Sequence, residues 1–442
     1  GGTTTTVETQ TPAKTLAPDQ KETFSFTFKP SAAGAQTLRV LYTGTYEGEE
    51  FQCAATLELK VYDAADLINV GVDYGHDNYY LSGDYAGSAG NFISFCADNG
   101  VKCSYIEAGQ FTYDNLKNYT LLVLTVPYRR NTAKATMYTE AEIAALKQYT
   151  DNGGKVILCS KSDRDNKYDN CAENSNALLT AIGAHSRIVN GIIVDNDLKA
   201  NEAYRLYLSS KENFNTGHPF TAGAYTSSNA FGTTPATDNQ TGFQLYNGGP
   251  VEVLDESKVQ VLVRGYQSTW GTHYDGYFDG SSFVPEYDES VDGRVTVKKG
   301  DVNVMTYEDL PGGGWVITSG VTFFSNYDIK SDQDYANRFI LRNILNSLKP
   351  AGTVTKIADV HKAAEKEEFT VEGTVTANAS GYDKNTAFFD CIYVQDDTRG
   401  INVFPVAGNY AEGMKVRVHG GVTYYCGEIE LNLSSDYNGS IE

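Results

Sequence analysis

The stretch Leu67-Ile68-Asn69-Val70-Gly71-Val72 is a short, nearly continuous apolar run, and it decides how the middle of this 442-residue chain folds. Strands of parallel sheets are covered on both faces and are therefore apolar almost throughout, whereas half-exposed strands alternate. The run predicts a strand buried on both faces. Residues 101–106, 119–126 and 155–158 are further predicted strands.

Helical patterns separate these strands. Residues 88–99 place apolar side chains at helical spacing and are closed by Gly100. Thr139-Glu140-Ala141-Glu142 is a capping box, and the helix that it begins should end at Gly153-Gly154. Residues 315–320 are another buried strand, and 333–348 form an amphipathic helix. Alternating strands and helices predict a doubly wound parallel sheet with helices on both faces.

The flanking regions have a different rhythm. Period-2 alternation before residue 66 predicts a small antiparallel β-sandwich, with strands at 24–28, 38–42 and 55–61. After residue 350 the chain is again all-β, with predicted strands at 368–375, 388–396, 400–406, 415–422 and 428–433. We therefore expect three domains, at 1–65, 66–350 and 351–442. The middle one carries a long polar insertion at about 166–312, with some strands such as 259–263.

Three segments of the middle domain resemble the class I glutamine-amidotransferase-like (flavodoxin-like) domains of Gram-positive surface proteins. They are residues 73–78, 151–157 and 320–326, the last preceding Tyr335-Ala336-Asn337-Arg338. The first block resembles the Ig-like spacers of such proteins. The last block, with Gly-Met-Lys-Val-Arg-Val-His-Gly at 413–420, resembles the OB-type barrels of secreted bacterial peptidases and nucleases. In many amidotransferase-like members the catalytic cysteine is lost and the domain is a scaffold.

Charge and composition disfavour some classes of binding partner. The formal net charge is −21, which repels phosphate backbones and anionic membranes. Residues 352–442 carry seven Lys and Arg against fourteen Asp and Glu, a net −7, so we expect no nucleic acid on the barrel. No run of about 18 apolar residues exists, and no membrane span is expected. We expect both ends to be cuts made within a longer chain.

Seven cysteines are spread along the chain without a CxxC motif, which excludes a zinc ribbon. Most are expected to be buried free thiols. Cys391 and Cys426 lie on two strands of one predicted barrel and are the pair best placed for a disulfide, although free thiols are expected there too.

Ligands of doubly wound sheets bind beyond the carboxyl ends of the strands. This rule predicts a binding rim composed of Asp73, His76, Asp77, Asn78, Arg129, Ser160 and Asp163. Oxygen ligands from Asp73, Asp77 and Asp163 could hold a structural Ca²⁺; no other cofactor is expected. A hydrogen-bonded loop network is the alternative interpretation.

Two further candidates have structural alternatives. Cys159 follows the fourth strand, where an amidotransferase places its nucleophile, but no glycines flank it and no His-x-Glu arrangement follows, so a buried thiol is favoured. Tyr266, Trp270 and Tyr274 could form an aromatic platform for sugar rings, or could pack inside a hairpin.

The expected function is therefore that of a non-catalytic accessory region in a secreted, cell-surface bacterial protein, beside a peptidase (such as a subtilase-type enzyme) or nuclease domain. Its partners would be other domains of the same polypeptide. Two alternatives stay open: a module that binds a glycan or a host protein or polymer, and a hydrolase that depends on Cys159.

Overall fold

The structure is a computed structural model, and it divides the chain into two compact units, Gly1–Leu67 and Ile68–Glu442. It describes residues 9–10, 17, 19–28, 30, 34–61, 68–81, 85–127, 137–162, 170–221, 224–225, 242–273, 276–278, 283–285, 295–330, 335–349, 354–379, 390–406, 410–434, 437 and 439–441. The chain is a mixed α/β protein with several sheets. The three predicted domains stay a prediction.

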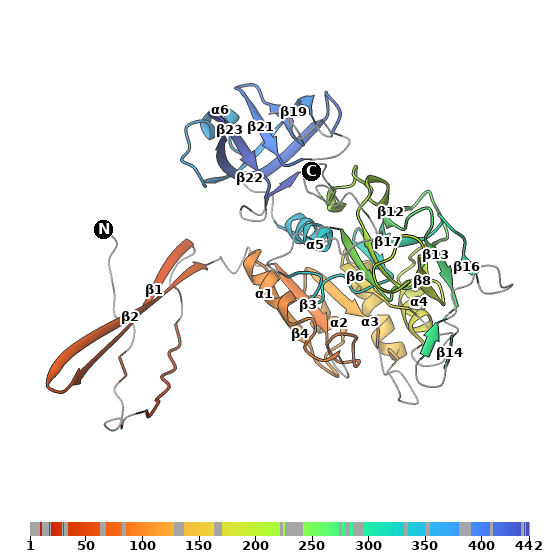
Figure 1. Ribbon diagram of the computed structural model, residues 1–442, viewed down its shortest axis with the longest axis horizontal. Helices are drawn as coiled ribbons and strands as arrows, with labels where there is room; N and C mark the ends of the chain where they lie inside the picture. Colours follow the sequence, from red (N-terminus) through yellow and green to blue (C-terminus); the bar gives the residue numbers. More distant parts are fainter. Residues whose placement is uncertain are drawn as a thin grey trace. The chain divides into compact units, whose positions relative to one another are not determined.

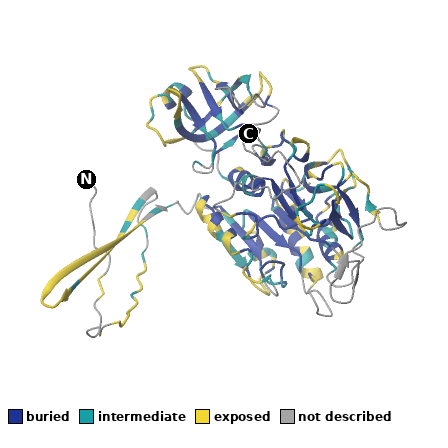
Figure 2. Ribbon diagram, in the orientation of Figure 1, coloured by how far each residue is buried: buried dark blue, intermediate teal, exposed yellow. Residues whose placement is uncertain are grey.

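The first unit contains a long β-hairpin. β1 (Gly34–Tyr46) pairs antiparallel with β2 (Glu49–Val61) through a turn in which Glu47 and Gly48 both have positive φ. Two predicted strands lie within it. The strand predicted at 24–28 is wrong, because these residues form no ladder with any part of the chain that the structure describes. Figure 2 shows the hairpin mostly exposed. The described residues form one sheet here, so the predicted sandwich stays a prediction.

The second unit is built on a nine-stranded sheet (Figure 1). Five strands run parallel in the order β4 (Lys102–Ile106), β3 (Asn69–Asp73), β5 (Leu121–Thr125), β6 (Lys155–Cys159) and β18 (Trp315–Ser319). This confirms the parallel sheet. The antiparallel strands that continue it are β17 (Asn303–Asp309), β11 (Val251–Val253) and β7 (Ser186–Ile188), with β12 (Val259–Arg264) also paired to β17.

Helices cover both faces of the sheet, as predicted. α1 (Gly90–Asp98) and α5 (Ala336–Ser347) pack on one hydrophobic cluster. α2 (Tyr113–Leu116), α3 (Glu140–Asp151) and α4 (Cys171–Ala181) contribute to the other. The predicted capping box is present at the start of α3, where Thr139 and Glu142 each satisfy a backbone N–H of the other. Gly153, with φ of 87°, ends that helix.

The predicted insertion does not form a separate layer, because β7, β11, β12 and β17 join the central sheet. Its other strands form small sheets: β8 (Ile192–Val194), β13 (Trp270–Thr272) and β16 (Val295–Val297) in one, β9 (Arg205–Leu208) and β10 (Phe243–Tyr246) in another, and β14 (Gly276–Phe278) with β15 (Phe283–Pro285). Two short 3₁₀ helices are η3 (Lys211–Asn213) and η4 (Pro219–Thr221).

The C-terminal strands form a closed ladder. The strands are β19 (Glu368–Asn378), β20 (Ile392–Gln395), β21 (Gly400–Phe404), β22 (Lys415–Tyr425), β23 (Glu428–Asn432) and β24 (Ser440–Ile441), preceded by α6 (Ile357–Val360). β19 pairs with both β20 and β22, which closes the barrel, and β21 and β23 are parallel. All five predicted strands overlap observed ones. Their inward side chains form a cluster of their own.

Candidate functional site

The candidate site predicted from the sequence lies at the carboxyl ends of the parallel strands, and the structure brings part of it together. β3 ends at Asp73, and the loop after it carries His76 and Asn78, all three buried. Asn78 forms a backbone bridge with Pro127, which follows β5. Loops from two neighbouring strands therefore meet at this edge, as the parallel topology requires.

The carboxylate of Asp73 is the centre of a hydrogen-bond network. It accepts from the His76 ring Nδ1 at 2.9 Å, from Asn78 Nδ2 at 2.9 Å and from the Tyr138 hydroxyl at 2.6 Å. The backbone N–H of Gly75 donates to its other oxygen at 3.2 Å. Four donors thus surround a fully buried carboxylate, the arrangement that keeps a buried charge stable.

His76 lies between two carboxylates. Its Nε2 is 3.2 Å from Glu142 Oε1, while its Nδ1 faces Asp73. The ring packs against Tyr138, with centroids 4.1 Å apart, and against the edge of Phe111. Burial alone lowers the pKa of His76, but hydrogen bonds and attraction from the two carboxylates outweigh it and raise that pKa above 6.5. The imidazole is therefore held toward its charged, doubly donating form.

Glu142 serves two elements with one carboxylate. Its Oε2 accepts the backbone N–H of Thr139 at 2.8 Å and so caps α3, while its Oε1 faces His76. Burial raises the pKa of Glu142, yet donation from Thr139 and the neighbouring His76 lower it overall. The imidazole consequently ties the loop after β3 to the first turn of α3.

Asn78 completes the network. Its Oδ1 accepts the backbone N–H of His76 at 3.0 Å, and its Nδ2 donates to the carbonyl of Thr125, at the end of β5, at 2.7 Å. The polar groups at this edge are therefore bonded chiefly to one another. This matches the alternative interpretation of a loop network that covers the sheet. Tyr138 and Glu142 were missed as site residues, since only the folded chain brings them here.

Cys159 does not have the surroundings of a nucleophile. It ends β6 and is fully buried, and burial raises the pKa of its thiol well above 9. An activated thiol needs access and a base or positive neighbour that lowers its pKa. Ser160, also fully buried, accepts a hydrogen bond from Ser175 at 3.1 Å. Cys159 therefore has the surroundings of a buried structural thiol, the interpretation that the sequence favoured.

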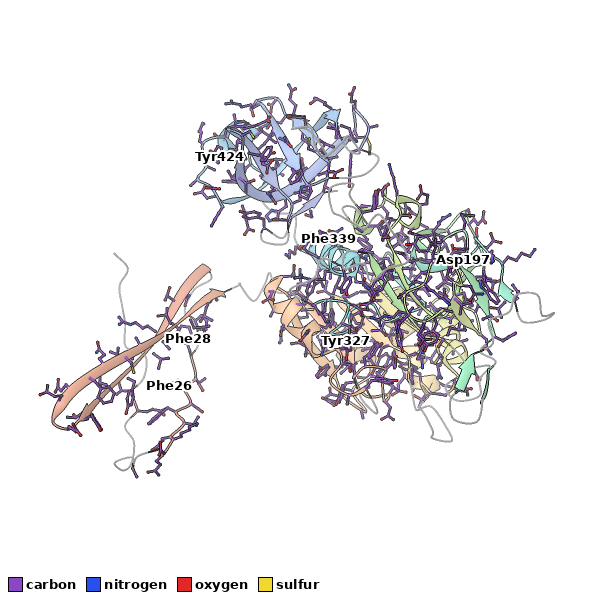
Figure 3. All side chains as sticks on the ribbon, in the orientation of Figure 1. Phe26, Phe28, Asp197, Tyr327, Phe339 and Tyr424 are labelled. Carbon is purple, nitrogen blue, oxygen red and sulfur yellow. The ribbon has the colours of Figure 1, made fainter. Side chains whose placement is uncertain are left out.

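Two buried charged residues near the strand ends were not singled out from the sequence. Lys161 is buried, with its Nζ 5.0 Å from the centre of the Tyr79 ring. Asp328 is buried beside the exposed Tyr327 (labelled in Figure 3) and accepts from the backbone N–H and hydroxyl of Ser325. Burial raises the pKa of Asp328 to about 7, although the two donors of Ser325 oppose this. Its charge therefore changes near neutrality.

The predicted aromatic platform is corrected by the structure. Trp270 is 1% exposed and packs with Ile192, Val194 and Ala203 in a small core of its own. Tyr266 is buried, and its hydroxyl donates to the carbonyl of Tyr207 at 2.6 Å. Neither ring has a free face for a sugar. Tyr274 lies outside the described residues.

The remaining rim residues form no metal site within the part of the chain that the structure describes. There, no group of three or more His, Cys, Asp or Glu side chains is placed to hold an ion. The carboxylate oxygens of Asp73 already accept hydrogen bonds from the donors described above. Asp77 is half-buried with a φ of 53°. Arg129 and Asp163 lie outside the described residues, so the Ca²⁺ prediction is untested at Asp163. No described helix is long and apolar enough to cross a bilayer.

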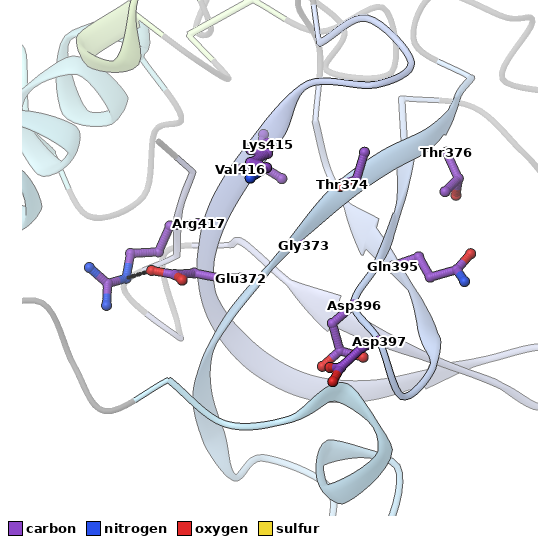
Figure 4. A pocket seen from close by; sticks show the side chains of 10 residues that line it. All are labelled: Glu372, Gly373, Thr374, Thr376, Gln395, Asp396, Asp397, Lys415, Val416 and Arg417. Atoms are coloured by element: carbon purple, nitrogen blue, oxygen red, sulfur yellow. Dashed lines mark ion pairs between the residues drawn. The ribbon is translucent and has the colours of Figure 1, made fainter.

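The barrel carries an open groove of about 810 Å³ along β19, the end of β20 and the start of β22 (Figure 4). Its charged side chains are of both signs: Arg417 Nε lies 3.3 Å from Glu372 Oε1, and Asp397 is bonded to Lys356. Thr374, Thr376 and Gln395 add neutral polar groups. The groove is therefore not the basic track that a phosphate backbone needs.

The comparisons with known proteins give distant likenesses. No protein-family model and no curated protein matches the chain. Among solved structures, the "mmIFT52 N-terminal domain" is 14% identical with a TM-score of 0.41, covering 63% of this chain and 96% of that one. A putative ThuA-like protein from Bacteroides uniformis is 13% identical with a TM-score of 0.34, covering 65% and 93%. The hypothetical protein ygiW from E. coli is 19% identical with a TM-score of 0.15, covering 19% and 86%. Likenesses at these TM-scores carry no argument about ligand or activity.

Proposed function

We propose that this chain is a non-catalytic accessory region of a secreted, multidomain bacterial surface protein, in which it positions a hydrolase or anchoring domain of the same polypeptide. The observation that carries the proposal is the strand-tip network. Asp73, His76, Asn78 and Glu142 are bonded to one another and to backbone, and Cys159 is sealed in the core. An active site at this edge would leave reactive groups open to a substrate.

The finer domain assignments belong to the same proposal. We assign residues 66–350 to a glutamine-amidotransferase-like domain that acts as a scaffold, and residues 351–442 to an OB-type barrel. The closed ladder, with β21 parallel to β23, supports the barrel assignment. The hairpin of β1 and β2 would be part of an Ig-like spacer.

Thiol accessibility tests the non-catalytic assignment. Iodoacetamide is added to the folded chain at neutral pH, and labelling of each cysteine is followed by mass spectrometry. The exposed Cys53 and Cys426 should react first, whereas Cys159 should react only after unfolding. Native-state labelling of Cys159 as fast as that of Cys426 would contradict the proposal.

The accessory role has a separate test in the reading frame. The coding sequence that flanks this chain should encode a peptidase, nuclease or anchoring domain. When that domain is expressed alone and this chain is added in trans, we expect complex formation in size-exclusion chromatography or a change in turnover. A flanking frame without any such domain would count against the accessory role, whatever the labelling result.

The barrel groove favours a second candidate function, the binding of a glycan or another neutral polymer. Its threonines and Gln395 offer hydrogen-bond partners for hydroxyl groups, and its paired charges add little net field. Affinity gels containing bacterial and host polysaccharides would test this, with Gln395→Ala as the variant and exposed Tyr327→Ala as the control. Equal mobility of all three proteins in every gel would exclude the groove as such a site.

A further inference from the structure

Two cysteines meet where α1 is followed by β4. Cys96 lies in the last turn of α1, and Cys103 is the second residue of β4. Between them, Gly100 adopts a φ of 70°, and the backbone N–H of Val101 donates to the carbonyl of Cys96 at 2.8 Å. This tight turn reverses the chain, so that the strand runs back beneath the helix (Figure 1).

Both side chains face the same side of the sheet. Cys103 pairs with Val70 of the neighbouring parallel strand, and paired residues of adjacent strands project to the same face. Val70 belongs to the cluster beneath α1 that also contains the buried Cys96, and Cys103 packs against that cluster. Ile106, three residues further on, lies in the cluster of the opposite face, as the strand alternation requires.

The two thiols therefore lie on the same cluster, from adjacent elements of the chain. Hydrogen bonding with Cys103, together with burial, raises the pKa of the Cys96 thiol. Cys96 is fully buried, while Cys103 is only partly buried. Of the two, Cys103 is therefore the thiol that an oxidant can reach first, and Cys96 is the thiol that can react with it in a second step.

We propose that Cys96 and Cys103 form an intramolecular disulfide when the chain meets an oxidised thiol compound such as glutathione disulfide or the disulfide of a thiol oxidoreductase. The Cys103 thiolate attacks one sulfur of the oxidant and displaces the other as a thiolate. Cys96, losing its proton, then attacks the Cys103 sulfur and displaces the second thiolate. Two protons leave the protein, and the two electrons pass to the oxidant's disulfide, which is reduced to two thiols.

The cross-link would fasten an edge of the central sheet. β4 is the first strand of the sheet order and has one strand neighbour, β3, among the described residues. A covalent bond to α1 would hold that edge strand in place when its hydrogen bonds open. The inference does not depend on the proposed function, because neither thiol takes part in the hydrogen-bond network around Asp73.

Peptide mapping tests the proposal directly, because Lys102 lies between the two cysteines. The full chain is reduced, desalted and equilibrated with increasing ratios of glutathione disulfide to glutathione, then acid-quenched, alkylated under denaturing conditions and digested with trypsin without reductant. Cleavage after Lys60, Lys102 and Lys117 places the cysteines in peptides 61–102 and 103–117. We expect these peptides to become linked, with the mass of their sum less that of two hydrogen atoms.

Two variants serve as controls. Cys103→Ser should abolish the linked pair and leave Cys96 alkylated, whereas Cys426→Ser removes an exposed thiol elsewhere and should leave the pair unchanged. In wild type, oxidation should also raise the urea midpoint, and Cys103→Ser should show no such rise. Peptide 418–442, which carries Cys426, reports that the oxidant has reacted. If that peptide becomes glutathionylated while 61–102 is still recovered alkylated and unlinked, the proposal is overturned.

Discussion

Replacing His76 by Phe tests whether the imidazole holds the strand-tip network through its charge or merely through packing. A phenyl ring fits the space between Tyr138 and Phe111, so the ring contacts persist. The substitution removes the hydrogen bond to the buried Asp73 and the one to the partly exposed Glu142. The variant therefore separates polar from apolar contributions.

The expected magnitude follows from these two contacts. A hydrogen bond to a buried charged group contributes about 1.5–3 kcal/mol, and an ion pair that reaches solvent contributes roughly 0.5 kcal/mol. Asp73 keeps its donors from Tyr138, Asn78 and Gly75, so it is not left unpaired. We expect the free energy of unfolding to fall by about 2–3.5 kcal/mol in mild acid.

The sign of the pH dependence is set by the raised pKa of His76. A group whose folded pKa exceeds its unfolded value of 6.5 contributes its full stability below pH 6.5 and loses it as the pH rises through the folded pKa. The difference between wild type and His76→Phe should therefore shrink between about pH 6 and about pH 9.

Urea unfolding followed by circular dichroism at the two pH values measures this difference. His361→Phe is a matched control, because its ring nitrogen contacts only the carbonyl of Gly400 among the bonds described for it. A His76→Phe difference that is the same at both pH values would refute the charge argument. A difference below about 1 kcal/mol in mild acid would refute the assigned magnitude.

Three further variants extend the test. Tyr138→Phe removes a 2.6 Å donor to Asp73 and should lower the free energy of unfolding by about 1–2 kcal/mol in urea titrations. Asp328→Asn removes a carboxyl whose pKa burial raises to about 7. Since burial of its charge opposes folding, wild type should lose stability as the pH rises from about 4 to about 7, and the variant's melting temperature should fall less. Trp270→Ala empties a small core and should lower the free energy of unfolding by about 3–5 kcal/mol by the same urea titration, without altering polysaccharide-gel retention of the folded fraction.

The parallel core was predictable because a strand that is buried on both faces must be apolar along its whole length, and this is visible in its own sequence. Leu121–Thr125 is buried at every position, and its sequence is a nearly continuous apolar run. The capping box at Thr139 was equally readable, since both partners lie within one helical turn. By contrast, β11 is only three residues long. Its place in the sheet, between β17 and β7, depends on contacts with distant segments, and these leave no pattern in its own sequence.

The location of the site was predictable, but the full set of its residues was not. Because β3 ends at Asp73, parallel topology places Asp73 and His76 at the rim. Tyr138 reaches Asp73 from 65 residues away, and no local pattern marks such a contact. The prediction that Trp270 is exposed was wrong for a related reason. A tryptophan in a Gly- and Asp-rich stretch suggests exposure, yet Ile192, Val194 and Ala203, from a distant segment, enclose this ring.

The ladder of the C-terminal barrel has a consequence for how copies of the barrel coexist at high density. β19 is hydrogen-bonded to a neighbour on either side, so the ring of β19, β20, β21, β23 and β22 presents no long vacant backbone row, and only the two-residue β24 has a single strand neighbour among the described residues of this ladder. Edge-to-edge strand addition between molecules needs such a row. The closed ring of the barrel therefore offers no long strand edge through which copies of the barrel could aggregate into fibres.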